Sequence, residues 1–174
     1  MGTLSLGLMR MMEMQSKSAR KMETDLNRFQ LSNLLMQTMN DREACRNTFL
    51  TGGPRTLQGS AGATVLGGPP INEIRNREND VILSVGDRWA LSSPTEISID
   101  QFGVRNFDPV VVAVPVPGEE YGFAELTVLT SPVQPNVNAA ARNRITSVRV
   151  GIVRQDAAPF NILGCYFVSD ILNQ

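Results

Sequence analysis

The chain has 174 residues, of which 42% are hydrophobic and 19% are charged, and this suits one globular domain with an appendage. Its formal net charge of −1 offers no basic surface for nucleic acid, so no nucleic-acid partner is expected. Histidine is absent, which removes the commonest general base and the commonest zinc ligand. These totals favour a structural protein over an enzyme.

The first 40 residues differ in composition from the rest. All the methionines lie at or before Met39, and no proline occurs before Pro54. Good helix formers fill this stretch, so we predict one helix over residues 4–40, about 55 Å long at ~1.5 Å per residue. The helix should end near Asn40 and Asp41, which favour cap positions, and a short turn should follow at residues 43–45.

The two halves of this helix have different patterns. The first half has almost no polar side, and its apolar residues are Leu4, Leu6, Leu8, Met9, Met11, Met12 and Met14. A small domain cannot cover so long a helix, so this half is expected to project and to contact lipid or other protein. It is too short an apolar run to span a membrane. Copper binding by these methionines is an alternative, although Met more often fills apolar contacts.

In the second half, apolar residues recur at steps of three and four. We predict that this stripe docks the helix on the body. Its members are Met22, Leu26, Phe29 and Met36, with Asn33 between the last two, and it is widened by Leu31, Leu34, Leu35 and Met39.

Three segments follow from the composition: a helical stalk (1–40), a turn with a cysteine and a Gly/Pro-rich loop (41–80), and a β body (81–174). The loop, over residues 51–70, contains neither GK[ST] nor GxGxxG, so nucleotide binding is not expected.

In the β body, apolar residues alternate with polar ones, which predicts about five or six strands joined by connections too short for helical crossovers. Residues 110–116, apolar at nearly every position, are predicted to form a central strand buried on both faces. The fold class is therefore α+β, a long N-terminal helix packed on an antiparallel sheet.

The two cysteines, Cys45 and Cys165, lie far apart and match no metal-binding spacing. They are either two buried thiols or one disulfide. In an exported protein the disulfide is the better interpretation, because closing so long a loop stabilises the fold by ~4 to 5 kcal/mol in the simple entropic description.

Carboxylates are the only catalytic candidates, and no partner base accompanies them. Glu119 and Glu120 in a Pro-Gly turn, and Asp100 and Asp108 near phenylalanines, are interpreted as surface acids. Loop calcium at Asp87, Glu96 or Asp100 lacks the spacing of an EF-hand. We therefore predict no catalytic residue, no cofactor and no metal site.

The layout resembles that of type IV pilins and pseudopilins. The resemblance is carried by residues 14–18 with Met22, Glu23 and Leu26, by residues 41–49, and by residues 162–165. It implies a pilin-like fold in which the second half of the helix packs on the sheet and a cysteine pair, here Cys45 with Cys165, staples the terminal region. The processing signature of the family is not matched at Gly2–Ser5, so we expect the helix to be cut within its apolar part.

The resemblance also implies a function. The chain would be a non-enzymatic structural subunit of a type IV pilus or pseudopilus-like filament that assembles through its N-terminal helix. A minor or tip subunit used in adhesion, motility or secretion fits the same resemblance. Its partners would be other pilin-like subunits through the helix, and the inner membrane in the full-length form. It would lie in the periplasm and at the cell surface.

Two alternatives of other classes stay open. One is a coat or fibre component of a virion or phage, in which the helix mediates oligomerisation. The other is a periplasmic binding module for a peptide or glycan, which requires a cleft among the loops at 51–80 and 131–144.

Overall fold

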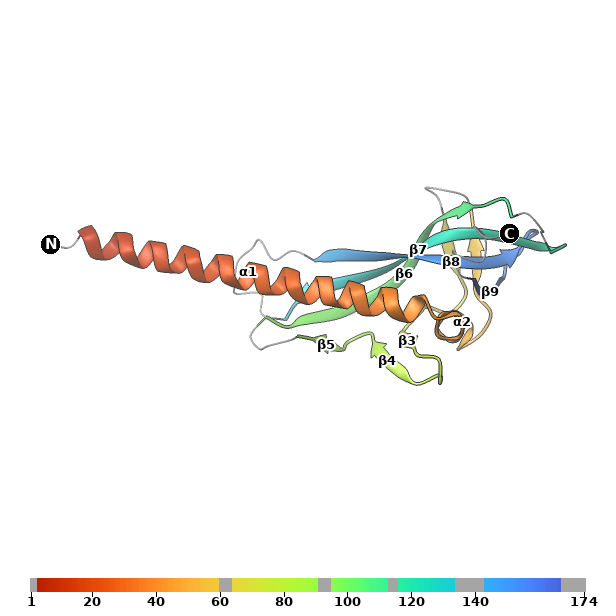
Figure 1. Ribbon diagram of the computed structural model, residues 1–174, viewed down its shortest axis with the longest axis horizontal. Coiled ribbons are helices and arrows are strands. Elements are labelled where there is room, and N and C mark those ends of the chain that lie inside the picture. The colour runs from red at the N-terminus through yellow and green to blue at the C-terminus, as the bar shows by residue number, and fades with distance from the viewer. Residues whose placement is uncertain (1–2, 60–63, 91–94, 113–115, 134–142, 167–174) are drawn as a thin grey trace.

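A computed structural model describes residues 3–59, 64–90, 95–112, 116–133 and 143–166; for residues 3–8 it describes the backbone only. Helix α1 (Thr3–Met39) is the longest element and extends well beyond the body, so its N-terminal end lies far from the sheet (Figure 1). Helix α2 (Arg42–Leu50) follows directly. The predicted long helix is confirmed, whereas the predicted turn at residues 43–45 is wrong, because these residues begin α2.

The cap between the two helices explains this difference. Asp41 is the N-cap of α2, and its carboxylate accepts hydrogen bonds from the backbone N–H groups of Glu43 (2.9 Å) and Ala44 (3.0 Å). A capping carboxylate satisfies N–H groups that have no partner within the helix. The favourable cap thus ends one helix and starts another.

The described residues form nine strands in three antiparallel sheets. The main sheet has the order β5-β6-β7-β8-β9, and two hairpins, β1-β2 and β3-β4, lie beside it. The strands are β1 (Thr56–Gln58), β2 (Val65–Gly67), β3 (Glu73–Arg75), β4 (Val81–Ser84), β5 (Arg88–Trp89), β6 (Ile97–Pro109), β7 (Glu119–Pro132), β8 (Arg144–Gln155) and β9 (Ile162–Tyr166). The α+β prediction, a long helix on an antiparallel sheet, is confirmed. The predicted irregular loop at 51–70 contains the β1-β2 hairpin instead.

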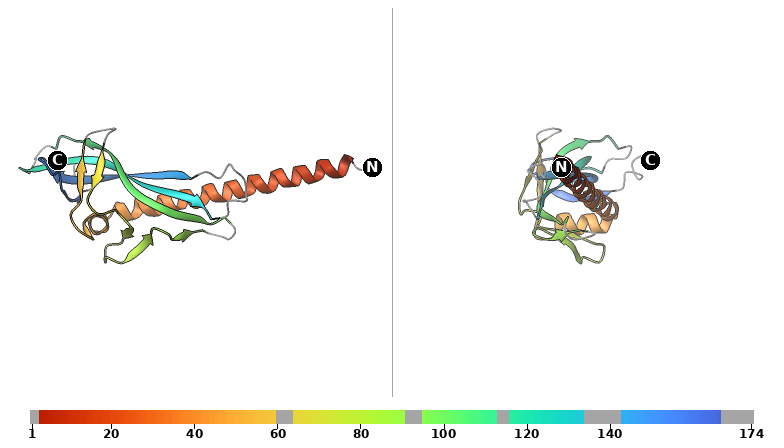
Figure 2. Two further views of the ribbon diagram at one scale, coloured as in Figure 1. Left: turned by 180° about the vertical axis from the view of Figure 1, so that it is seen from behind. Right: turned by 90° about the vertical axis from the view of Figure 1, so that its left-hand side faces the viewer.

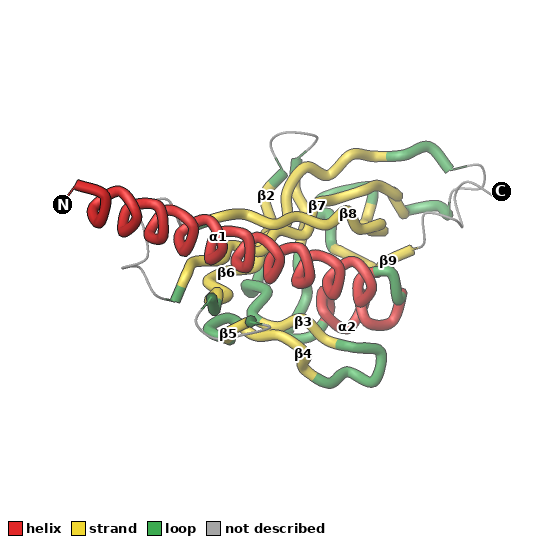
Figure 3. Tube along the Cα trace, turned by 60° about the vertical axis from the view of Figure 1, so that its left-hand side comes forward, coloured by secondary structure: helices red, strands yellow, loops and turns green. Residues whose placement is uncertain are grey.

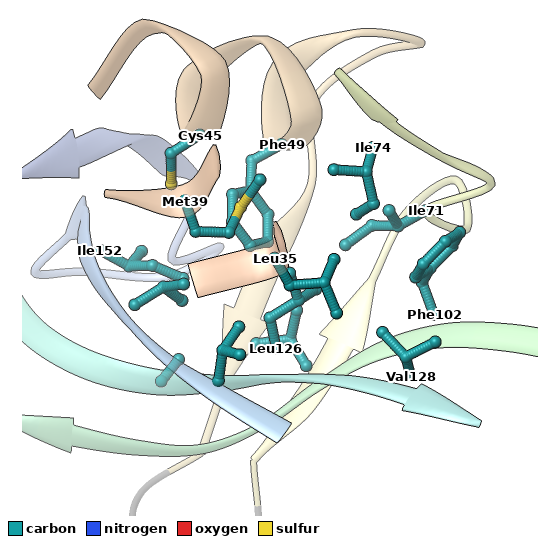
Figure 4. Packing of buried hydrophobic residues seen from close by; sticks show 14 of the residues in the cluster. Leu35, Met39, Cys45, Phe49, Ile71, Ile74, Phe102, Leu126, Val128 and Ile152 are labelled. Carbon is teal, nitrogen blue, oxygen red and sulfur yellow. The ribbon is translucent and has the colours of Figure 1, made fainter. Parts of the chain in front are cut away.

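The second half of α1 runs along the main sheet, and the first half leaves it (Figures 1 and 2). Among the described side chains of α1, the buried apolar ones are those of Leu31, Leu35 and Met39. They join one hydrophobic core with Phe49 of α2 and with residues of the sheet such as Leu126 (Figure 4). Burying an aliphatic side chain of this size stabilises a fold by about 1.5–3 kcal/mol, so this short stripe suffices to hold α1 on the body.

The predicted docking stripe is wrong. Met22, Leu26, Phe29 and Met36 are all exposed, Met22 to 72% and Phe29 to 62%. The stripe that docks contains Leu31, Leu35 and Met39, which were predicted only to widen the first. Two buried polar residues decide the orientation, since Asn27 and Arg28 lie on the docked side and bond to the body.

Asn27 fixes α1 to the segment before β6. Its side-chain amide donates to the backbone carbonyl of Thr95 (2.9 Å), and the indole N–H of Trp89 donates to its backbone carbonyl (3.2 Å). Arg28 donates to the hydroxyl of Thr130 on β7 (3.4 Å) and to Asp25 (3.4 Å). Turning the other stripe inward would take these groups away from their partners, and a buried polar group without a partner is costly.

The predicted central strand at 110–116 is also wrong. Strand β6 ends at Pro109, residues 110–112 and Val116 lie in no strand, and Val111 is 96% exposed; residues 113–115 lie outside the described part. Prolines at 109, 115 and 117 lack the N–H groups that a central strand needs on both sides. The described residues of the run, 110–112 and Val116, therefore lie between β6 and β7 and not in a strand.

Candidate assembly surface

Three features of the chain are candidates for function: the projecting half of α1, the disulfide region, and a small polar hollow beside α2. The first carries four large exposed hydrophobic residues, Met9, Met11, Met12 and Met14. Every residue from Met9 to Glu23 is exposed.

The methionines of the projecting half have no cover from the body. Met9, Met11, Met12 and Met14 are exposed to between 62% and 71%. The side chains of Leu4, Leu6 and Leu8, predicted to belong to the same surface, lie outside the described part. Exposed apolar groups that gather on one element mark an interaction site more often than scattered ones do.

Polar residues in the same half support the helix itself. The Lys17 ammonium donates a hydrogen bond of 2.8 Å to Glu13, and this bond, with the charge of Lys17, lowers the pKa of the Glu13 carboxyl. An exposed pair at this spacing adds only a few tenths of a kcal/mol to helix stability. The ion pair is therefore a minor contribution to the helix and leaves the apolar residues uncovered.

A cluster of charges marks the place where α1 reaches the body. Asp25 is paired with Arg28 (3.4 Å) of its own helix and with Arg144 (3.1 Å) at the start of β8. Burial, together with the charge of Arg144, lowers the pKa of Arg28. The cluster ties the helix to the sheet at the point beyond which α1 projects.

The disulfide joins the segment after α1 to the end of the sheet. Cys45 of α2 is bonded to Cys165 of β9 across 120 positions, and both residues are buried. Of the two readings that the sequence left open, the disulfide is correct. The bond holds α2 against the edge strand β9, so the C-terminal end of α1 is anchored covalently through its neighbour.

A hollow of about 290 Å³ lies beside the C-terminal end of α2. Its lining residues are Thr48, Thr51, Gly52, Arg55, Pro69, Pro70, Asn72, Glu73 and Arg75. Arg55 is buried and donates to the backbone carbonyls of Thr51 (2.9 Å), Pro69 (2.9 Å) and Pro70 (3.1 Å), and also to that of Phe49. Its guanidinium thus satisfies carbonyls around the end of α2 and is not offered to a ligand. Part of the cleft required by the binding-module alternative, residues 134–142, lies outside the described part.

The carboxylates interpreted as surface acids have structural partners. Asp100 accepts from the Ser131 hydroxyl (2.9 Å), Glu119 from the Tyr121 hydroxyl (2.7 Å), and Glu120 from Arg154 (2.7 Å). Asp108 lies 4.0 Å from Arg149.

The residues considered for calcium have other contacts. Asp87 accepts from the backbone N–H of Ser84 (2.7 Å), and Glu96 pairs with Arg88 (3.5 Å). Among the described residues, no three potential metal ligands lie together.

Comparison with known proteins adds nothing to this geometry. No protein family, no curated protein and no solved structure matches the chain. Within the part of the chain that the structure describes, no helix combines the length and the apolar character needed to cross a membrane. Function must therefore be inferred from the helix and its surfaces.

Proposed function

We propose that this chain is a non-enzymatic structural subunit of a pilin-like or pseudopilin-like filament, and that the projecting half of α1 is the part through which it assembles. The observation that carries the proposal is the exposure of Met9, Met11, Met12 and Met14 on a helix whose other half is fixed to a complete body. A surface of this kind suits burial by neighbouring subunits or lipid.

Two further features support the proposal. The layout of a long helix, a main antiparallel sheet and a late cysteine is the one that the resemblance to pilins implies. The Cys45–Cys165 disulfide suits a protein that acts in an oxidising compartment, such as the periplasm or the cell surface. Anchoring in the inner membrane before assembly belongs to the same proposal.

The test is incorporation into filaments in the native host. A tagged chain should appear in the filament fraction sheared from the cell surface, and Met11→Lys with Met14→Lys should remove it from that fraction. Arg10→Lys, an exposed change on the same helix that keeps the charge, is the matched control. If the unaltered chain never enters the filament fraction while it accumulates as a folded protein, the proposal is wrong; a soluble particle of fixed subunit number would instead favour a coat or fibre component.

A further inference from the structure

The outward side of α1 carries a second apolar stripe, which lies opposite the docked side. Its large members, Met22, Leu26, Phe29 and Met36, extend along the half of α1 that is fixed to the body, yet all four are exposed. In Figure 3, α1 runs in front of the strands, and none of the described helices and strands covers its outward side. The body therefore folds without using this stripe.

The stripe has the period of a coiled coil. Successive members are separated by three and four residues in strict alternation, an average of ~3.5, which is the spacing that keeps a seam facing a second helix. The seam consists of Met12, Gln15, Ala19, Met22, Leu26, Phe29, Asn33 and Met36. We call this set the α1 seam. In the heptad repeat, the first (a) position is occupied by Met12, Ala19, Leu26 and Asn33. The fourth (d) position is occupied by Gln15, Met22, Phe29 and Met36.

The body does not obstruct the α1 seam. At ~100° per residue, Leu31 lies about half a turn around the helix from Met22, and Leu35 lies about half a turn from Leu26. The docked side and the seam thus point in opposite directions. A second helix laid along the seam leaves each body on the far side of its own helix.

Two amide side chains within the seam identify the occupant. Gln15 and Asn33 each carry a donor and an acceptor, so each is satisfied by an identical amide at the same depth and is left without a partner by an apolar one. A single buried Asn is known to set register and oligomer state in coiled coils. We infer that the α1 seam packs against the α1 seam of a second copy of this chain, as a parallel two-stranded coiled coil in register.

The charges beside the seam agree with a parallel pair. In that arrangement Glu23 faces Ser18 of the second copy, and Asp25 faces Gln30, so no like charges meet. An antiparallel pair centred on the seam would bring Glu23 or Asp25 close to the same residue of the other copy, which is destabilising. The seam begins at Met12 in the projecting half, but its large members Met22, Leu26, Phe29 and Met36 lie on the half of α1 that is docked on the body. This pairing goes beyond the proposed function, because it does not require a filament.

Sedimentation equilibrium of the full chain tests the pairing. We expect a monomer–dimer equilibrium, and we expect Leu26→Lys with Phe29→Lys to raise its dissociation constant at least about 100-fold, because four charges would enter the seam of each dimer. Glu13→Lys places the same charge on the opposite side of the helix and should leave the constant within about threefold. Circular dichroism and thermal unfolding should show that all variants fold, since the altered residues are exposed.

Register is tested by cross-linking. Met22→Cys should form an interchain disulfide in mild oxidant, because equivalent seam positions meet only in a parallel, in-register pair, whereas Arg20→Cys, away from the seam, should not. Asn33→Leu should tighten association and allow oligomers larger than dimers.

Three results would each overturn the inference. They are a chain that stays monomeric at every accessible concentration, an association that the seam variants leave unchanged, and equal cross-linking at both positions. Incorporation into filaments is measured separately, so failure of one proposal is distinguishable from failure of the other.

Discussion

Replacing Arg154 should destabilise the body far more than replacing an arginine five residues away on the same strand. Arg154 is 5% exposed. Two of its guanidinium nitrogens lie 2.7 Å from the Glu120 carboxylate, and the guanidinium also donates hydrogen bonds to the backbone carbonyls of Leu57 and Gly59. Its guanidinium also lies 4.0 Å from the centre of the Phe107 ring. One side chain thus ties β7 and β8 to the segment that contains β1.

The expected cost can be estimated from these contacts. Arg154→Met keeps most of the aliphatic stem but removes every donor, leaving the Glu120 carboxylate and two carbonyls without their partner. Breaking a buried ion pair costs about 3–5 kcal/mol, and because the Glu120 side chain is 30% exposed, we expect a loss near the lower end, about 3 kcal/mol. For a chain of this size the midpoint of thermal unfolding should fall by roughly 6–12 °C.

Arg149→Met is the matched control. Arg149 is also on β8, but its side chain is 64% exposed and its ion pair with Asp108 is long, at 4.0 Å, so its removal should cost less than about 1 kcal/mol. Urea unfolding of both variants, compared at equal m-values, measures the difference. Adding Glu120→Gln to Arg154→Met should recover part of the loss. Losses for Arg154→Met and Arg149→Met within about 0.5 kcal/mol of each other would refute the reasoning.

Three other outcomes follow from single features of the fold. Reducing the disulfide, or replacing both Cys45 and Cys165 by Ala, should lower the free energy of unfolding by about 5 kcal/mol in the entropic description. Urea unfolding with and without reductant measures this loss, and a loss below about 1 kcal/mol would contradict the prediction. Asp41→Ala should cost about 1 kcal/mol by removing the cap of α2, whereas Asp41→Asn should cost little. Burial raises the pKa of Tyr166 to about 12, so the unfolded chain releases that proton first and stability should fall between about pH 10 and 12; Tyr166→Phe should reduce this slope.

The fold class could be predicted from the sequence because the helical pattern and the alternating strand pattern each extend over many residues and differ clearly. Helix formers without proline fill residues 4–40, and the alternation along β7 and β8 places Leu126 beside Val148 and Ala124 beside Val150 in the core. Patterns of this length survive local exceptions. The prediction of a central strand at residues 110–116 failed, because it relied on hydropathy, which favoured burial, whereas the prolines are incompatible with a central strand.

Hydropathy could not choose between the two apolar stripes of α1. The choice depends on Asn27 and Arg28, whose partners Thr95 and Thr130 are distant in sequence and become neighbours only in the folded chain. Polar residues usually mark the exposed side of a helix, and here they mark the docked side. No signal within the helix sequence reveals such partners, although the strict alternation of steps along the α1 seam could have indicated a coiled-coil surface.

The error in the docking stripe has a functional consequence. Had Met22, Leu26, Phe29 and Met36 been the docked residues, folding and association would compete for the same side chains, and no substitution could separate them. Because Leu31 and Leu35 hold α1 on the sheet instead, the α1 seam contributes little to the stability of one copy. Changes at Leu26 and Phe29 should therefore alter association without altering folding, whereas Leu35→Ala should cost about 2–5 kcal/mol of stability. A seam substitution that unfolds the isolated chain would show that the outward side of α1 is not independent of the body.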